Sequence, residues 1–212
     1  MKNEKFKRIL SSLILLPIAL FFIVKGSFLF NFFILICFLI TSYEWHMMSK
    51  KKSYYILGFI FLLFSFYLIY HLRNDFVGDY IYLLMITLIC ISTDIGGYIF
   101  GKLFKGPKLT KVSPKKTYSG MIGGYLLSII FLSIFYTYIF LKPPNLTSDI
   151  FVFILLVSTA SQFGDIIISY FKRLSKIKHT GKIIPGHGGL LDRIDGMIFA
   201  FPFSYIIFKI NI

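Results

Sequence analysis

The sequence contains little cysteine, little acid and no long polar stretch. Its two cysteines, Cys37 and Cys90, lie inside apolar runs without metal-ligand spacing, so we interpret them as packing residues with free thiols. The longest polar stretches, 101–119 and 172–193, are too short to bury a hydrophobic core, which excludes a separate soluble domain. Only 9 residues are Asp or Glu, against 23 Lys or Arg. Ionisable side chains beside membrane segments are costly, so each acid there is a candidate functional residue.

Hydrophobic residues, by contrast, make up 57% of the chain, which includes 26 Phe and has a mean hydropathy of +0.78. This composition predicts an all-α, polytopic integral membrane bundle with about seven transmembrane helices, since each crossing needs about 20 apolar residues. No small-residue cleavage site follows the first segment, so we expect it to be retained. The predicted spans are 9–24, 27–43, 54–71, 79–99, 120–141, 150–169 and 194–210.

The basic residues predict the orientation of these spans. With the N-terminus inside, the Lys and Arg clusters at 2–8, 50–52, 102–116 and 172–193 all fall on the cytoplasmic side, as the positive-inside rule requires. The opposite side keeps only Lys25, Arg73, Lys142 and Lys209. Because the net charge of +14 lies in loops beside spans, it favours anionic lipid and phosphorylated solutes as partners over nucleic acid.

A carboxylate interrupts the fourth apolar segment. Asp94 lies within this segment, and Tyr98 follows at i+4 on the same helix face. An unpaired carboxylate there would be expensive, which indicates a functional role for Asp94. The nearby Gly96, Gly97 and Gly101 would let either another helix or a ligand approach the backbone closely, and the sequence leaves both open.

The segment Ser113-Pro-Lys-Lys-Thr117 combines hydroxyls with two lysines directly before the fifth apolar segment. Ser113 and Thr117 can cap a helix or bind phosphate oxygens. Lys115 and Lys116 are then expected close to a helix N-terminus, where an anion is already favoured. The segment therefore predicts phosphate binding.

The sixth apolar segment carries an acid and a base at helical spacing. Asp165, Ser169 and Lys172 follow at i, i+4 and i+7 and share one face, with Arg173 adjacent to Lys172. An acid deeper in the membrane and a base nearer its edge is the arrangement expected for a cation held beneath a phosphate chain. The alternative is an internal Asp–Lys pair that stabilises the bundle.

The run Pro-Gly-His-Gly-Gly-Leu-Leu-Asp-Arg-Ile-Asp at 185–195 joins glycines to charged side chains. Its glycines permit backbone conformations in which amides point at an anion, and His187 among them has little to pack on, so we favour a ligand contact. Asp192 and Asp195 share a helix face at i, i+3, and Arg193 can bind phosphate bidentately.

The chain divides at about residue 78 into an apolar half, 1–78, and a half, 79–212, that holds nearly all unusual polar residues, within a single membrane domain. Glu44 is the exception in the first half. It lies between Tyr43 and Trp45, whose aromatic rings suit a membrane interface. We therefore favour an interfacial or helix-packing role for Glu44 over a ligand contact.

Taken together, these motifs resemble the phosphatidate cytidylyltransferase (CDP-diacylglycerol synthase) family over about residues 90–197. The signature is Asp94-x-x-x-Tyr98-x-x-Gly101, Ser113-Pro-Lys-Lys-Thr117, Gly120, Gly123-Gly124, Ser169-x-x-Lys172-Arg173, Pro185-Gly-His-Gly-Gly189 and Asp192-Arg193-x-Asp195. Two positions depart from the family pattern. His179 stands where the family usually has Asp, and Gly196 where it usually has Ser.

The resemblance implies transfer of CMP from CTP to phosphatidate in the bilayer, giving CDP-diacylglycerol and pyrophosphate, with Mg²⁺ as cofactor. It implies a multi-pass protein of the bacterial inner membrane with a cytoplasmic active site, and it leaves a homodimer open. The alternatives are a CTP-dependent kinase of a membrane alcohol and a non-catalytic transporter or binding protein for anionic lipid.

With the chemistry of the residues, the resemblance assigns three sets of site residues. The catalytic set is Asp165, Lys172, Arg173, Asp192 and Arg193. The substrate-binding set is Ser113, Lys115, Lys116, Thr117, Ser169, His187, Gly188 and Gly189. The metal ligands are Asp165 and Asp192, supported by Asp195 and Asp94.

Overall fold

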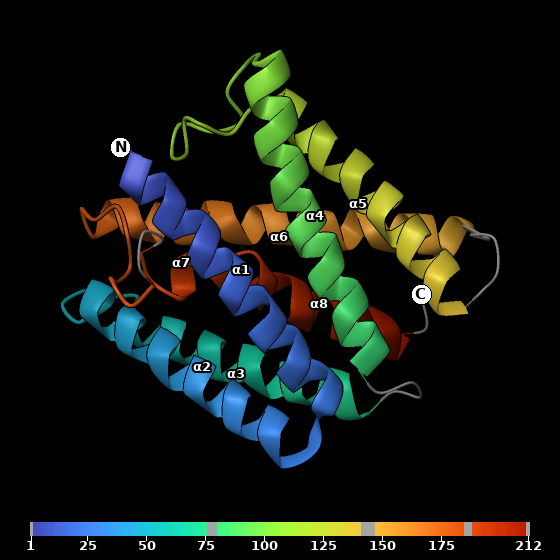
Figure 1. Cartoon of the computed structure of the whole chain (residues 1–212). Coiled ribbons are helices and arrows are strands. Elements are labelled where there is room, and N and C mark those ends of the chain that lie inside the picture. The colour runs from blue at the N-terminus through green and yellow to red at the C-terminus, as the bar shows by residue number, and fades with distance from the viewer. Residues whose placement is uncertain (1, 76–79, 141–146, 185–187, 211–212) are drawn as a thin grey trace. The chain divides into compact units, whose positions relative to one another are not determined.

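The computed structural model describes residues 2–75, 80–140, 147–184 and 188–210, and these residues are almost entirely helical (Figure 1). Their only β-type pairing is two isolated bridges, at 108 with 117 and at 184 with 188. Five helices, α2 to α6, are long and apolar enough to cross a membrane, and two shorter apolar helices cover Leu13–Lys25 and Met197–Ile210. The chain is therefore a polytopic helical membrane protein, as the sequence predicts.

The helices form two compact units, one of Met1–Leu84 with Phe171–Asp195 and one of Met85–Tyr170 with Gly196–Ile212. The first unit contains α1 (Lys2–Lys25), α2 (Ser27–Ser49), α3 (Tyr55–Asn74) and the single turn α7 (Leu191–Ile194). The second contains most of α4 (Tyr80–Phe104), α5 (Tyr118–Phe140), most of α6 (Ser148–Leu174) and α8 (Met197–Ile210). The predicted functional division at residue 78 stays a prediction.

In the first unit, α1 and α2 form a tight hairpin, and α2 and α3 lie side by side (Figure 1). Gly26 closes the hairpin with φ of +64°, a conformation that glycine adopts without strain. Arg73 of α3 secures this turn, because its Nε donates to the Ile23 carbonyl at 3.0 Å and its guanidinium lies over the Phe30 ring. The hairpin is thus fastened to α3 by one buried cation.

At the other end of α2, an aromatic cluster joins the α2–α3 connection to the end of α6. Trp45 is buried, donates from Nε1 to the Tyr55 carbonyl at 3.0 Å, and makes edge contacts with the rings of Tyr54 and Phe171. Tyr54 also shares a 2.8 Å hydrogen bond with Ser175. Trp45 is therefore a core residue, and the prediction of an interfacial ring at this position was wrong.

In the second unit, α4 and α5 approach so closely that their glycines meet. A Cβ added to Gly120 would lie 2.7 Å from the carbonyl oxygen of Gly97, and Gly96 likewise faces the Gly123 carbonyl. Of the two interpretations left open for the α4 glycines, the structure shows helix packing. Such contacts between small residues let backbones pack directly in a membrane.

Hydroxyl hydrogen bonds connect α6 to α4 and α5, and a glycine lets the start of α8 pack on α6. Thr93 of α4 donates to Ser158 of α6 at 2.8 Å, and Tyr125 of α5 shares a 2.9 Å hydrogen bond with Thr159. The last predicted span, 194–210, is interrupted, because α7 ends at Ile194 and α8 begins at Met197. Gly196 at this break packs directly on Ser161, whose carbonyl oxygen would be 2.8 Å from an added Cβ.

Candidate functional site

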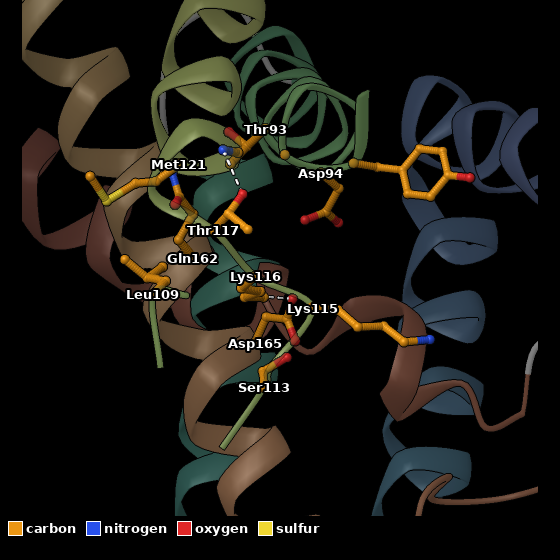
Figure 2. A pocket seen from close by; sticks show the side chains of 13 residues that line it. Thr93, Asp94, Leu109, Ser113, Lys115, Lys116, Thr117, Met121, Gln162 and Asp165 are labelled. Atoms are coloured by element: carbon orange, nitrogen blue, oxygen red, sulfur yellow. Dashed lines mark hydrogen bonds and ion pairs between the residues drawn. The ribbon is translucent and has the colours of Figure 1, made fainter. Parts of the chain in front are cut away.

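The second unit contains a cavity of about 250 Å³ between α4, α6 and the segment that precedes α5 (Figure 2). It is lined by six of the residues predicted to form the site, which come from three separate parts of the sequence: Asp94, Ser113, Lys115, Lys116, Thr117 and Asp165. Tyr98 lines it too, so Asp94 and Tyr98 share a face as expected. The structure therefore brings together two of the predicted carboxylates and two of the three predicted lysines.

A compact turn shapes the lysine segment. Lys116 donates its backbone N–H to the Ser113 carbonyl at 3.0 Å and accepts from Leu109 N at 2.8 Å. Thr117 then caps α5, because its Oγ1 accepts the N–H of Gly120 at 3.1 Å. Of the two roles predicted for Thr117, the structure shows the cap. The turn and the cap together fix the backbone position from which the Lys116 side chain extends.

Lys116 and Asp165 form the ion pair at the centre of this cavity. The Lys116 Nζ lies 2.5 Å from the Asp165 Oδ2, and Ser169 donates to the Asp165 Oδ1 at 3.4 Å. Both side chains remain partly open, at 24% and 27% exposure, and Figure 2 shows Lys115 extending away from the pair. The internal pair between Asp165 and Lys172 that was considered for α6 is not formed, because Asp165 pairs with Lys116 and Lys172 pairs with Asp192.

In the first unit, Lys172 and Asp192 form a second, more deeply buried ion pair. Their Nζ and Oδ1 atoms lie 2.7 Å apart, with side-chain exposures of 10% and 4%, and the Asp195 Oδ2 is 3.6 Å from the same ammonium. The other oxygen of Asp192 accepts backbone N–H groups from Thr180 at 2.9 Å and Gly189 at 3.2 Å. Both oxygens of Asp192 are therefore already hydrogen-bonded by the chain.

This environment determines the charge state of Asp192. Burial alone raises the pKa of a carboxyl group, but the Lys172 ammonium and the two backbone amides outweigh it, so the pKa of Asp192 lies below its ordinary value of 3.8. Asp192 is therefore ionised under all physiological conditions, as a partner of Lys172 requires.

The glycines of the 185–195 run lie close to this ion pair. Gly188 has φ of +98°, and an added Cβ would lie 2.8 Å from the Asp192 Oδ2. Its N–H bonds the Ile184 carbonyl, while the N–H of Gly189 bonds Asp192, so both amides are bound within the chain. His187 lies outside the described residues. Arg193 is exposed, and Arg173 donates to the Ile177 carbonyl at 3.2 Å.

Sequence reasoning missed two polar residues. Glu44 of α2 is only 1% exposed and accepts hydrogen bonds from the chain around 180–191, so of the interfacial and packing roles favoured for it the structure shows the packing role. Gln162 of α6 lines the cavity beside Asp165. The signal available for Glu44 was the one used for Asp94, an acid inside an apolar segment. The adjacent Trp45 is a residue typical of membrane interfaces, and it favoured the interfacial interpretation of Glu44.

The arrangement of the carboxylates shows which of them could hold the predicted metal ion. Among the described residues, no three His, Cys, Asp or Glu side chains form a group that could hold a metal ion. Asp94 and Asp165 nevertheless line one cavity beside open space. Mg²⁺ in phosphate-transfer sites usually takes one or two carboxylates and completes its coordination with water and substrate phosphates. The donor set at the cavity fits that pattern, whereas the oxygens of Asp192 are engaged.

Comparison with known proteins gives consistent matches. Residues 52–211 match the model of the cytidylyltransferase family. The phosphatidate cytidylyltransferase of Rickettsia bellii is 34% identical over 97% of this chain and 91% of its own length, and that of Rickettsia typhi is 34% identical over 100% and 93%. The Bacillus subtilis phosphatidate cytidylyltransferase is 33% identical over 71% of this chain and 56% of its own length.

Proposed function

The chain belongs to the cytidylyltransferase family, and from this premise we propose that it transfers CMP from CTP to phosphatidate. A phosphate oxygen of phosphatidate forms a new bond to the α-phosphorus of CTP, and the bond from that phosphorus to the bridging oxygen of the β-phosphate breaks. The products are CDP-diacylglycerol and pyrophosphate. The attacking oxygen is already ionised, so the site needs no strong general base and must instead neutralise and align several negative charges.

The observation that best supports this proposal is the partly open Lys116–Asp165 pair in the cavity. An ammonium at 24% exposure can exchange its carboxylate for a phosphate oxygen without a change of fold. Lys115, Ser113 and Thr117 come from the same short segment and would add contacts to the triphosphate. We therefore assign the CTP phosphates to this cavity.

The charged residues of the 172–195 region have a different part in the proposal. Lys172, Arg173 and Arg193 would bind the phosphate of phosphatidate, with Ser169, His187, Gly188 and Gly189 as polar contacts. The acyl chains stay in the bilayer beside the apolar helices.

We propose Mg²⁺ as the cofactor, since the acids at the cavity suit a hard cation. When bound, it would neutralise charge on the phosphate oxygens. The described contacts favour Asp94 and Asp165 as its ligands. They favour a supporting role for Asp192, which holds Lys172 and two backbone amides, with Asp195 beside it.

We further propose that the protein lies in a bacterial inner membrane with its N-terminus and active site in the cytoplasm, and that residues 79–212 carry the catalytic residues. The basic segments all fall on one side of the predicted spans, which supports this orientation. The homodimer left open by the sequence would be tested by the mass of the detergent-solubilised protein.

The decisive experiment is product identification. Purified protein is incubated with labelled CTP, phosphatidate and Mg²⁺, and the expected products are CDP-diacylglycerol and pyrophosphate. Lys116→Ala should lower turnover at limiting CTP, while Lys51→Ala, an exposed lysine of the α2–α3 connection, serves as the matched control. CDP with a phosphorylated lipid would identify a kinase. Lipid binding without turnover under any metal would identify a binding protein.

A further inference from the structure

Glu44 places a buried carboxylate against the segment that carries the signature residues 188–195. Its Oε1 accepts the N–H of Leu190 at 2.8 Å, and its Oε2 accepts the N–H of Leu191 at 2.8 Å and the hydroxyl of Thr180 at 3.1 Å. We propose that Glu44 is a positioning residue for the reaction, holding α7 and the preceding loop in the register that aligns Asp192 and Lys172. This inference rests on the proposed function.

The burial of Glu44 supports a specific role. A carboxylate removed from water is strongly destabilising unless hydrogen bonds replace its hydration. Here three donors do so, and two glycines make room for the acid. A Cβ added to Gly181 would lie 2.7 Å from the Glu44 Oε1, and Gly189 packs equally tightly on the other oxygen. The loop is thus shaped around the carboxylate.

Glu44 and Asp192 share the same short segment. Thr180 donates its backbone N–H to Asp192 and its hydroxyl to Glu44. The next donors alternate in the same way, since Gly189 N bonds Asp192 while the two following amides bond Glu44. The donors to Glu44 and the donors to Asp192 are thus neighbours along the chain. Loss of the hydrogen bonds to Glu44 is therefore expected to move Asp192, and with it the ammonium of Lys172.

A residue that only stabilised the helix bundle would behave differently from a positioning residue. General destabilisation lowers the amount of active enzyme and the melting temperature. A positioning residue lowers kcat in protein that is still folded and leaves the KM for CTP unchanged, because the proposed CTP cavity is built from residues 93–165 and contains no part of the Glu44 network. The split between kcat and KM separates the two roles.

The test uses Glu44→Gln in the full-length purified protein. Gln keeps the shape, but its NH2 group faces a backbone N–H, so the bond to either Leu190 or Leu191 is lost. We expect kcat to fall about 10- to 100-fold, about 1.4 to 2.7 kcal/mol at a tenfold change per 1.36 kcal/mol. The KM for CTP should stay within about twofold. Ser49→Ala is the matched control, since Ser49 is also buried on α2 but its hydroxyl bonds the Trp45 carbonyl of its own helix.

Amide hydrogen exchange gives a second, activity-independent measurement. Peptides covering 188–194 should exchange faster in Glu44→Gln and unchanged in Ser49→Ala. If Glu44→Gln does not fold, Thr180→Val, which removes one donor to Glu44 and keeps the backbone bond to Asp192, should show the same pattern with a smaller effect. Wild-type kcat with wild-type exchange would overturn the proposal, as would a rise in KM for CTP matching the fall in kcat. If the wild-type protein made a different product, the proposed function would fail, while the exchange measurement would still decide whether Glu44 holds this segment.

Discussion

The buried pair of Lys172 and Asp192 gives the sharpest quantitative prediction. Asp192→Asn keeps the size of the side chain but leaves the Lys172 ammonium, 10% exposed, without the carboxylate 2.7 Å away. Breaking a buried pair from one side usually costs about 3 to 5 kcal/mol. Asp195, 3.6 Å from the same ammonium, offsets part of that loss. We therefore expect Asp192→Asn to lower the free energy of unfolding by about 2 to 3 kcal/mol, below the usual range.

Lys172→Met removes the other partner. Asp192 then keeps its two backbone N–H donors from Thr180 and Gly189 but loses its cation. We expect Lys172→Met to lower the free energy of unfolding by about 2 kcal/mol, the contribution of one hydrogen bond between charged groups. In the double variant neither member of the Lys172–Asp192 pair is left without the other. The loss of unfolding free energy in the double variant should therefore fall short of the sum of the two single losses by about 1 to 3 kcal/mol.

The assay is reversible unfolding in mixed micelles, with the free energy of unfolding taken for the wild type, both single variants and the double variant. Asp149→Asn is the control, because Asp149 is an exposed acid at the start of α6 and its loss should change the free energy by less than about 0.5 kcal/mol. Single effects that add in the double variant to within about 0.5 kcal/mol would refute the coupling between the two residues.

Three further predictions concern the charge and orientation of the site. Lys116→Ala should raise the KM for CTP and lower kcat/KM by about 10- to 150-fold, the scale of one charge-assisted hydrogen bond, as measured by initial rates; an unchanged KM would remove Lys116 from the CTP site. Because the pKa of Asp192 is lowered in the folded protein, its contribution to stability is complete above the ordinary value of 3.8 and is lost as pH falls through the lower folded pKa. The stability difference between wild type and Asp192→Asn should therefore persist at pH 5 and shrink below about pH 4, as measured by unfolding at each pH. Single cysteines placed in 102–111 and in 174–182 of a cysteine-free variant should react with an impermeant reagent from the same side of the membrane; labelling from opposite sides would contradict the predicted orientation.

The sequence predicted the helices well because apolar length is a local property. All seven predicted spans correspond to helices, although the last span is broken between α7 and α8. Asp94, Lys116 and Asp165, which are all among the predicted site residues, line one cavity, as is expected of acids and bases that are expensive in apolar surroundings unless they face a cavity or one another.

The pairings could not be predicted, because helical spacing identifies a shared face without showing which segment packs against it. Asp165 and Lys172 lie on one helix at i+7, yet Asp165 takes its partner from the segment before α5 and Lys172 takes its partner from α7. Glu44 was harder still. Its partners are two backbone amides and one hydroxyl. Because every residue except proline has a backbone N–H, the sequence does not show which amides will bind a carboxylate. Only the glycines at 181 and 189, which make space for the acid, reflect it in the sequence.

The packing of Gly196 on Ser161 has a consequence for how this chain and its relatives diverge. A serine at 196, the residue usual in the family it resembles, would place a Cβ 2.5 Å from the Ser161 hydroxyl and 2.8 Å from its carbonyl oxygen. The two positions are therefore expected to covary: homologues with serine at the equivalent of 196 should carry a smaller residue at the equivalent of 161 or a wider spacing between α6 and α8. Restoring the family residue at 196 alone should harm this protein, while the same change combined with Ser161→Gly should be better tolerated.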